Sequence, residues 1–202
     1  MSRGNAISLV IVIAIALIAV AAASILHDGL SSRAKPTALE TMLARNARHL
    51  AIPAGARKLQ NPAAETPENL GDARLHFADH CAICHANDGS GDTQIGRNLY
   101  PKPPDLRRDE TQELADGELF WIIENGVRFT GMPAFGGAHG SEQDSWKLVR
   151  FIRRLPQLTE EERMEMERYN PKGPEDLEEE QEENDFLRGQ PIQQKSEGTH
   201  HH

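Results

Sequence analysis

The stretch "HCAICHAND", residues 80–88, contains both cysteines of this 202-residue chain, Cys81 and Cys84, and His85 directly follows the second one. Thiols three positions apart lie about one helical turn from each other. This spacing matches the vinyl groups on neighbouring pyrroles of a porphyrin, to which thiols add as thioethers, and the adjacent histidine becomes an axial iron ligand. The pattern predicts one covalently bound haem c, held by Cys81, Cys84 and His85.

Three other uses of the cysteine pair are less consistent with the sequence. A redox dithiol of the thioredoxin type would open a helix within a βαβ pattern, and no such alternation surrounds these residues. A zinc site would need a second pair of ligands at metal spacing, which is not visible. A disulfide closing so short a loop would add little stability. Haem attachment is therefore favoured over these alternatives.

The composition is unusual for a folded chain of this length, with 5% aromatic and 38% hydrophobic residues. Either part of the chain is not globular, or a large apolar cofactor supplies some of the core. The net charge of −9 belongs to residues 156–202, which hold 14 acidic and 5 basic residues, whereas residues 1–155 hold 17 of each. Because no basic stripe is available to neutralise phosphates, nucleic acid is not an expected partner. No small-molecule substrate is evident.

Residues 6–26, "AISLVIVIAIALIAVAAASIL", are apolar except for two serines. A helix of about 20 residues spans about 30 Å, the thickness of the hydrocarbon core of a bilayer. We interpret the segment as a single-pass anchor in the inner (cytoplasmic) membrane. A cleaved signal peptide is the alternative, although its apolar region is usually about 7–15 residues long. Since covalent haem attachment takes place on the outer face of the bacterial membrane, both interpretations place the haem domain in the periplasm.

Several short helices are predicted after this segment. Residues 35–53 form one, in which Leu39, Met42, Leu43, Ala47 and Leu50 make a single apolar stripe. We expect it to be a strap lying on the haem domain or the anchor rather than a docking face for another subunit. Further helices are expected at residues 68–80 and 116–125, and from Ser141, a candidate N-cap, to Leu155. No strand pattern is present, so the predicted fold is all-α, with three to five short helices around one haem.

The second iron ligand is predicted to be Met132, in the loop "GMPAF". Electron carriers of this type usually fill the second axial position with a thioether or an imidazole. Gly131 allows close approach of the backbone and Pro133 restricts it, which suits a loop that must hold a ligand in place. His80 and His139 are alternative ligands, and Met132 as a simple filler of an apolar gap is the remaining alternative.

In the order and spacing of these motifs, residues 68–157 resemble class I c-type cytochromes. The resemblance rests on Phe77 four residues before the first cysteine, the haem motif, "YPKPPDL", "GELFWIIENG" at 117–126, "GMPAF" and the helix from Trp146 to Leu155. It does not extend to the apolar segment, the strap or the acidic tail.

The resemblance implies that the first and last helices cross beside the haem, with Phe77 against Trp146 or Ile152. It also implies that a proline carbonyl, from Pro101 or Pro103, accepts a hydrogen bond from the ring of the haem-ligating histidine. Such a bond from outside the ligand set fixes the orientation of the ring.

These features divide the chain into an anchor (1–30), a strap and linker (31–67), a cytochrome c domain (68–157) and an acidic, partly disordered tail (158–202). The resemblance implies a monohaem cytochrome that is not an enzyme. It would carry single electrons at the periplasmic face between donor and acceptor complexes of a respiratory chain or dehydrogenase. A haem subunit permanently docked in a membrane oxidoreductase is the first alternative. The others are a haem enzyme or gas sensor without the Met132 ligand, and a metal-handling protein that uses His200–His202 and the acidic tail.

Overall fold

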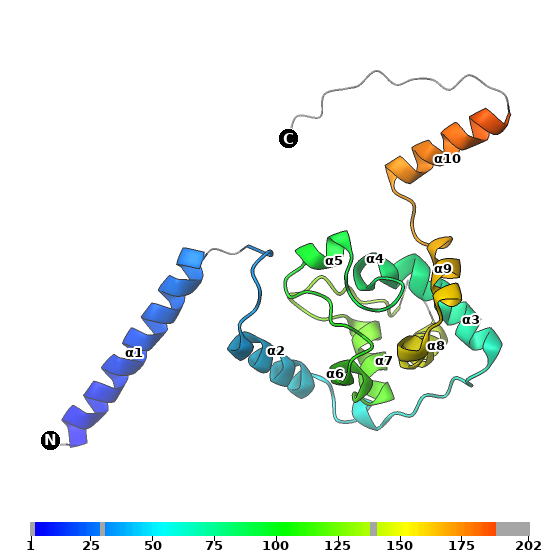
Figure 1. The fold of residues 1–202 in the computed structure, drawn as a ribbon. Coiled ribbons are helices and arrows are strands. Elements are labelled where there is room, and N and C mark those ends of the chain that lie inside the picture. Colours follow the sequence, from blue (N-terminus) through cyan, green and yellow to red (C-terminus); the bar gives the residue numbers. More distant parts are fainter. Residues whose placement is uncertain (1–2, 29–30, 138–140, 189–202) are drawn as a thin grey trace.

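The computed structural model describes residues 3–28, 31–137 and 141–188, and within these residues it contains helices and turns but no strand. The all-α fold class is therefore confirmed (Figure 1). His139 and His200–His202, named above as candidate ligands, lie outside the described residues.

The apolar segment forms α1 (Arg3–Asp28), which stands apart from the rest of the molecule in Figure 1. Its stretch Ile7–Ser24 is long and apolar enough to cross a membrane, and none of that stretch is buried within the molecule. A signal sequence near an N-terminus shares these features, so α1 is a candidate anchor by length and composition.

The strap helix is present as α2 (Ala38–Ala51) and starts with a capping box, in which Thr37 caps Glu40 and Glu40 caps Thr37 in return. It lies beside the folded body and contacts it through polar side chains. The expectation that its apolar stripe packs on the haem domain or the anchor is wrong, because Leu39 and Leu50 are 62% and 80% exposed. The helix contacts the body through charged and polar side chains, and the stripe stays exposed.

The body is built around two helices that pack against each other, α3 (Pro67–His76) and α8 (Glu142–Arg154). α3 continues through a π-helical turn, η2 (Phe77–Cys81), into α4 (Ala82–His85), so the first body helix runs directly into the haem motif. α7 (Asp116–Asn125) packs on α8. The remaining elements are η1 (Ala56–Lys58), α5 (Gln94–Asn98), α6 (Asp109–Gln112), η3 (Leu155–Gln157), α9 (Glu160–Glu167) and α10 (Pro174–Leu187). Single-turn helices raise the number of elements above the three to five expected.

Aromatic side chains join the principal helices. Phe77 contacts Phe151 of α8, with ring centroids 5.2 Å apart, and both side chains are almost fully buried. Trp146 stacks on Phe120 of α7 at 4.0 Å, with the rings nearly parallel. The aromatic partner of Phe77 is therefore Phe151 and not Trp146, because Trp146 lies about one and a half turns earlier on α8 and joins that helix to α7 instead.

The start of the acidic tail belongs to the packed body. Met166 of α9 is fully buried and is part of the same apolar core as Phe77 and Phe151. Arg74 of α3 forms an ion pair with Glu165 at 2.7 Å, which joins α9 to α3. The packed region thus extends beyond residue 157, where the sequence suggested a boundary, because a single apolar residue in an acidic helix was enough to dock it.

We predict that Met166→Ala lowers the free energy of unfolding by about 2–5 kcal/mol, the usual cost of replacing a buried methionine with alanine. Met164→Ala is the matched control, since Met164 lies in the same helix and is 57% exposed. Thermal unfolding of the haem-loaded protein measures both. Equal melting temperatures for the two variants would contradict the docking of α9.

Candidate haem site

The two cysteines and the histidine of the haem motif lie on consecutive turns at the end of the first body helix. Cys81 ends the π-helical turn, packs against the core and is half-buried. Cys84 and His85 belong to the single turn of α4, and both cysteines are free thiols. The backbone thus presents two thiols and one imidazole in a compact group.

The electrostatics of the thiols argue against a redox dithiol. Burial raises the pKa of Cys81 to about 12, and the neighbouring Cys84 adds to this effect. Burial also raises the pKa of Cys84. An activated redox cysteine needs a lowered pKa, because the thiolate is the nucleophile. Both thiols are protonated at neutral pH, which leaves thioether formation as the use most consistent with their surroundings.

His85 is held as a neutral imidazole. Burial lowers its pKa to about 4, and the backbone carbonyl of Pro104 opposes this shift with a smaller effect. The Nδ1 atom is buried and makes no hydrogen bond of standard geometry. Neutral imidazole is the form that binds a metal. A proline carbonyl of this loop acts on the ring, as the resemblance implied, but it is that of Pro104 and not of Pro101 or Pro103.

Two glycines allow the chain to turn sharply after the motif and bring the proline loop to the histidine. The amide of Gly91 donates to the carbonyl of His85 at 2.8 Å, and the amide of Leu106 donates to the carbonyl of Gly89 at 2.8 Å. Both glycines have positive φ. A Cβ on Gly91 would lie 2.9 Å from the carbonyl oxygen of Pro103, so a side chain there would push the loop away.

The next helix, α5, packs its backbone directly on the haem motif. A Cβ on Gly96 would lie 2.5 Å from the carbonyl oxygen of Gly91 and 2.6 Å from that of Cys84. The Thr93 hydroxyl donates to the carbonyl of Ile83 at 2.8 Å and accepts from the amide of Gly96 at 2.8 Å. Thr93 therefore caps α5 and ties it to α4 at the same time.

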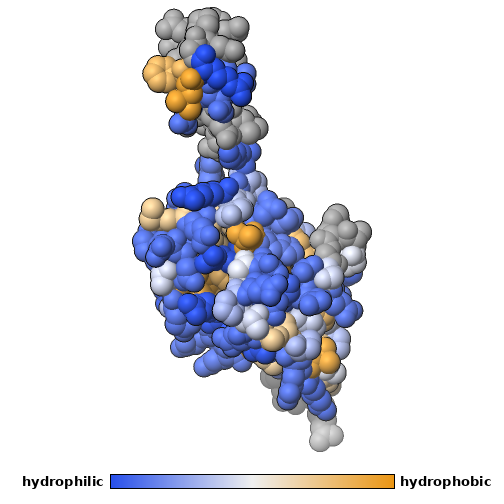
Figure 2. Space-filling model, turned by 90° about the vertical axis from the view of Figure 1, so that its right-hand side faces the viewer, coloured by the Kyte–Doolittle hydropathy of each residue, from blue (hydrophilic) through white to orange (hydrophobic). Residues whose placement is uncertain are grey.

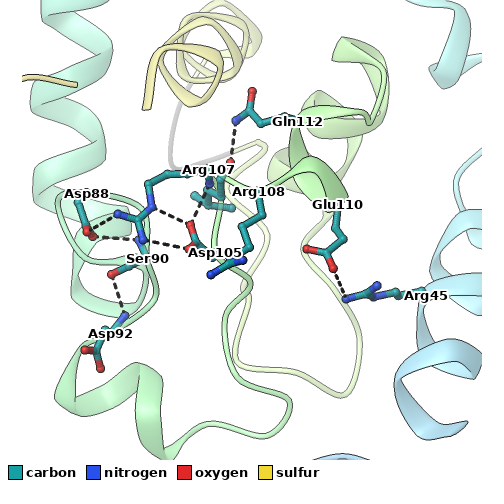
Figure 3. A network of polar contacts seen from close by, with 10 residues as sticks. Arg45, Asp88, Ser90, Asp92, Asp105, Arg107, Arg108, Glu110 and Gln112 are labelled. Carbon is teal, nitrogen blue, oxygen red and sulfur yellow. Dashed lines mark hydrogen bonds and ion pairs between the residues drawn. The ribbon is translucent and has the colours of Figure 1, made fainter. Parts of the chain in front are cut away.

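Ion pairs join the turn after the haem motif to the proline loop (Figure 3). Arg107 donates to Asp88 at 2.8 Å and to Asp105 at 2.8 Å, so it joins the turn after the motif to the proline loop. The hydrogen bonds from Arg107 hold the pKa of Asp105 at about 2. The Gln112 amide donates to the carbonyls of Leu106 and Ile152 and so connects the proline loop to α8.

Met132 lies in a loop that is tied to the end of α7. The amide of Val127 donates to the carbonyl of Met132 at 3.1 Å, and the Met132 amide donates to the Thr130 hydroxyl at 3.1 Å. Gly126 ends α7 with positive φ, and a Cβ there would lie 2.7 Å from the Met132 oxygen. Met132 itself is half-buried.

This loop also approaches the segment that leads into the proline loop. A Cβ on Gly131 would lie 2.8 Å from the Leu99 side chain, and Leu99 directly follows α5. The close approach of Gly131 and Leu99 thus brings the Met132 loop near the segment that leads into the proline loop.

His80, the alternative ligand that the structure describes, is engaged elsewhere. Its Nδ1 lies 3.2 Å from Asp79, its ring is 4.9 Å from that of His76, and half of its side chain is exposed. Among the described residues, no group of three or more His, Cys, Asp or Glu side chains is placed to hold a metal ion. Met132 as the second ligand stays a prediction.

The residues of the motif fit a covalently bound haem. Two protonated thiols and a half-buried, neutral imidazole lie on consecutive turns, and the backbone of α5 packs closely on this segment through Gly96. The loop contains three prolines, and the sequence alone could not show which of them lies near His85. That depends on the path of the chain through the turns at Gly89 and Gly91.

Comparison with known proteins agrees with this site. Residues 68–152 match the family model described as "Cytochrome C oxidase, cbb3-type, subunit III". The matched range begins at α3 and ends within α8, so it includes the haem motif, the proline loop and the Met132 loop. No curated protein matches the chain.

We predict that Gly96→Ala lowers the yield of haem-loaded protein and destabilises it by about 1–3 kcal/mol, the usual cost of forcing atoms into a packed region. Gly71→Ala is the control, because no atom lies within 4 Å of a Cβ at that helical position. That control is expected to stabilise α3 by about 0.5–1 kcal/mol. Haem absorbance per protein and thermal unfolding measure both. A Gly96→Ala variant as stable as Gly71→Ala would contradict the close approach.

We predict that Met132→Ala retains the haem but opens the sixth iron position. The reduction potential should fall by about 100 mV or more, because axial ligands set haem potentials over a range of about 0.8 V. Potentiometric titration and the ferric absorption spectrum measure the change. Met42→Ala, at an exposed site on α2, is the control and should leave both unaltered. An unaltered potential in Met132→Ala would assign the ligand to another residue.

Proposed function

Because residues 68–152 form a class I c-type cytochrome domain, with covalently bound haem c and a role in electron transfer, we propose that the chain is a membrane-anchored monohaem carrier. It would take single electrons from a donor complex at the periplasmic face and pass them to an acceptor complex. The observation that carries this proposal is the Cys81–His85 motif at the end of the first body helix, within residues that match a cytochrome family model.

Several residues of the chain would hold the cofactor, each through a different contact. The bound haem supplies a one-electron redox centre. In this proposal Cys81 and Cys84 would hold it through thioethers, and His85 and Met132 would each supply a side-chain ligand to its iron. The Pro104 carbonyl orients the His85 ring, and the glycine turns keep that carbonyl in place. With both axial positions taken by side chains, electron transfer is favoured over activation of a bound substrate.

The proposed location follows from α1 and from the side on which haem is attached. α1 would anchor the chain in the inner membrane, with the folded body in the periplasm. We propose the same division into anchor, strap with linker, cytochrome domain and tail, with α9 added to the cytochrome domain because Met166 is part of its core.

A second candidate is supported by the family description, which names a subunit of a cbb3-type oxidase. In that case the chain would be permanently docked in an oxidase or a related membrane complex. Purification of the full-length protein in mild detergent distinguishes the two. A partner present at constant stoichiometry supports the docked subunit, and a chain that purifies alone and is reduced and reoxidised by added membranes supports the mobile carrier.

We predict that replacing residues 1–30 with a cleavable export signal yields a water-soluble periplasmic protein with an unaltered haem spectrum, because α1 makes no buried contact with the body. Fractionation at low and high salt, followed by haem staining, measures this. The full-length chain is the control and should remain with the membranes. Loss of covalent haem in the truncated protein would contradict the independence of the cytochrome domain from its anchor.

A further inference from the structure

α2 is attached to the body along one side by polar contacts. The Tyr100 hydroxyl donates to Glu40 at 3.2 Å. Arg45 pairs with Glu110 of α6 at 3.2 Å, as Figure 3 shows, and His49 approaches the buried Glu118 of α7 to 3.3 Å. These contacts run along most of the helix, so they determine which side of α2 faces the body.

The apolar stripe of α2 is exposed and lies beside the polar contacts, since Met42 and His49 are seven residues apart on the helix. Leu39, Met42, Leu43 and Leu50 are 62%, 51%, 56% and 80% exposed, and their spacing of three, one and seven places them on one stripe. A helix on the surface of a water-soluble body normally turns such a stripe inward. In this chain the stripe is exposed, so we expect a lipid or protein surface to cover it.

The position of α2 in the chain points to the lipid bilayer. Residues 29–37 separate the end of α1 from the start of α2, and nine residues reach at most about 30 Å. If α1 spans the membrane, α2 cannot be far from its surface. The link before α2, residues 31–37, carries the exposed Arg33 and Lys35 and no acidic residue, whereas the whole chain has a net charge of −9. This segment is suited to anionic headgroups, which attract basic residues close to the surface.

We propose that α2 lies in the headgroup region of the bilayer, with its leucine and methionine stripe inserted among the lipids. Such helices combine an apolar face with a basic polar face and lie in the plane of the membrane. The proposal rests on the membrane anchor given under the proposed function. A protein partner is less consistent with the stripe, because the cores of protein interfaces are enriched in aromatic residues and methionine, and the stripe holds no aromatic residue and one methionine among its leucines.

The consequence is a defined orientation of the cytochrome domain. α2 would act as a spacer whose lipid side is apolar and whose body side contacts α6, α7 and the proline loop, so these elements would face the membrane. The side of the molecule seen in Figure 2, which is the right-hand side of Figure 1, is mostly hydrophilic over the folded body. That side would face the aqueous phase.

The test uses the full-length, haem-loaded protein in vesicles of a zwitterionic and an anionic phospholipid. A single cysteine is introduced and labelled with a fluorophore, since Cys81 and Cys84 are consumed by the haem. Leu43→Cys samples the stripe, and Ala44→Cys is the matched control on the next residue of the same helix. Ala14→Cys in the middle of α1 reports on the anchor itself. Quenching by lipids brominated at known depths gives the position of each label.

We expect the label at position 43 to lie about 5–10 Å below the headgroup boundary, the depth typical of interfacial helices, and the label at position 44 to lie nearer the water. A label at position 14 in the bilayer centre together with a label at position 43 in water would overturn the proposal for α2 while leaving the anchor intact. Protection of position 43 only in native membranes that contain other redox proteins would also overturn it, in favour of a protein partner. A label at position 14 outside the bilayer would instead refute the anchor, and with it the proposal.

Discussion

The structure depends on one constraint, the close approach of backbone to backbone around the haem motif. Gly96 lies against the carbonyls of Cys84 and Gly91, and Gly91 lies against Pro103. None of these positions has room for a Cβ, so three segments can meet within van der Waals distance. This contact holds the segments that follow the motif close to His85, and partial burial of its ring lowers the pKa and keeps the imidazole neutral. The packing around the site thus depends on the absence of a side chain at two positions, Gly91 and Gly96.

Beside the haem motif, two pairs of aromatic side chains join the principal helices. Phe77 and Phe151 join α3 to α8, and Phe120 and Trp146 join α7 to α8. α8 therefore contacts both other principal helices, which explains why it is the most buried of the three. The low aromatic content of the chain is sufficient because each aromatic pair is located at a crossing, and because the domain shares its core with a haem.

The segments outside the matched family range attach to the body in different ways. α9 docks through one buried methionine and the ion pairs of Arg74, whereas α2 docks through charged and polar contacts and leaves its apolar residues outside. The two modes have different consequences. A helix attached by apolar burial extends the core, and a helix attached by its polar side offers its apolar face to something else. In our proposal that partner is the membrane.

The sequence by itself determined the features that depend on local spacing. The thiols and histidine at 81, 84 and 85, the long apolar segment, the helix at 116–125 with its stop at Gly126, and the Ser141 cap could all be predicted, because a motif, a periodicity or a cap involves residues within a few turns of one another. The tertiary structure alone decided which long-range partners meet. In it, the ring of Phe151 packs against Phe77 and the Pro104 carbonyl acts on His85. Met166 joins α9 to the apolar core, and the stripe of α2 stays exposed. These choices depend on how far each loop advances the chain and on the rotation of each helix about its axis, and neither quantity is encoded in the spacing of apolar residues.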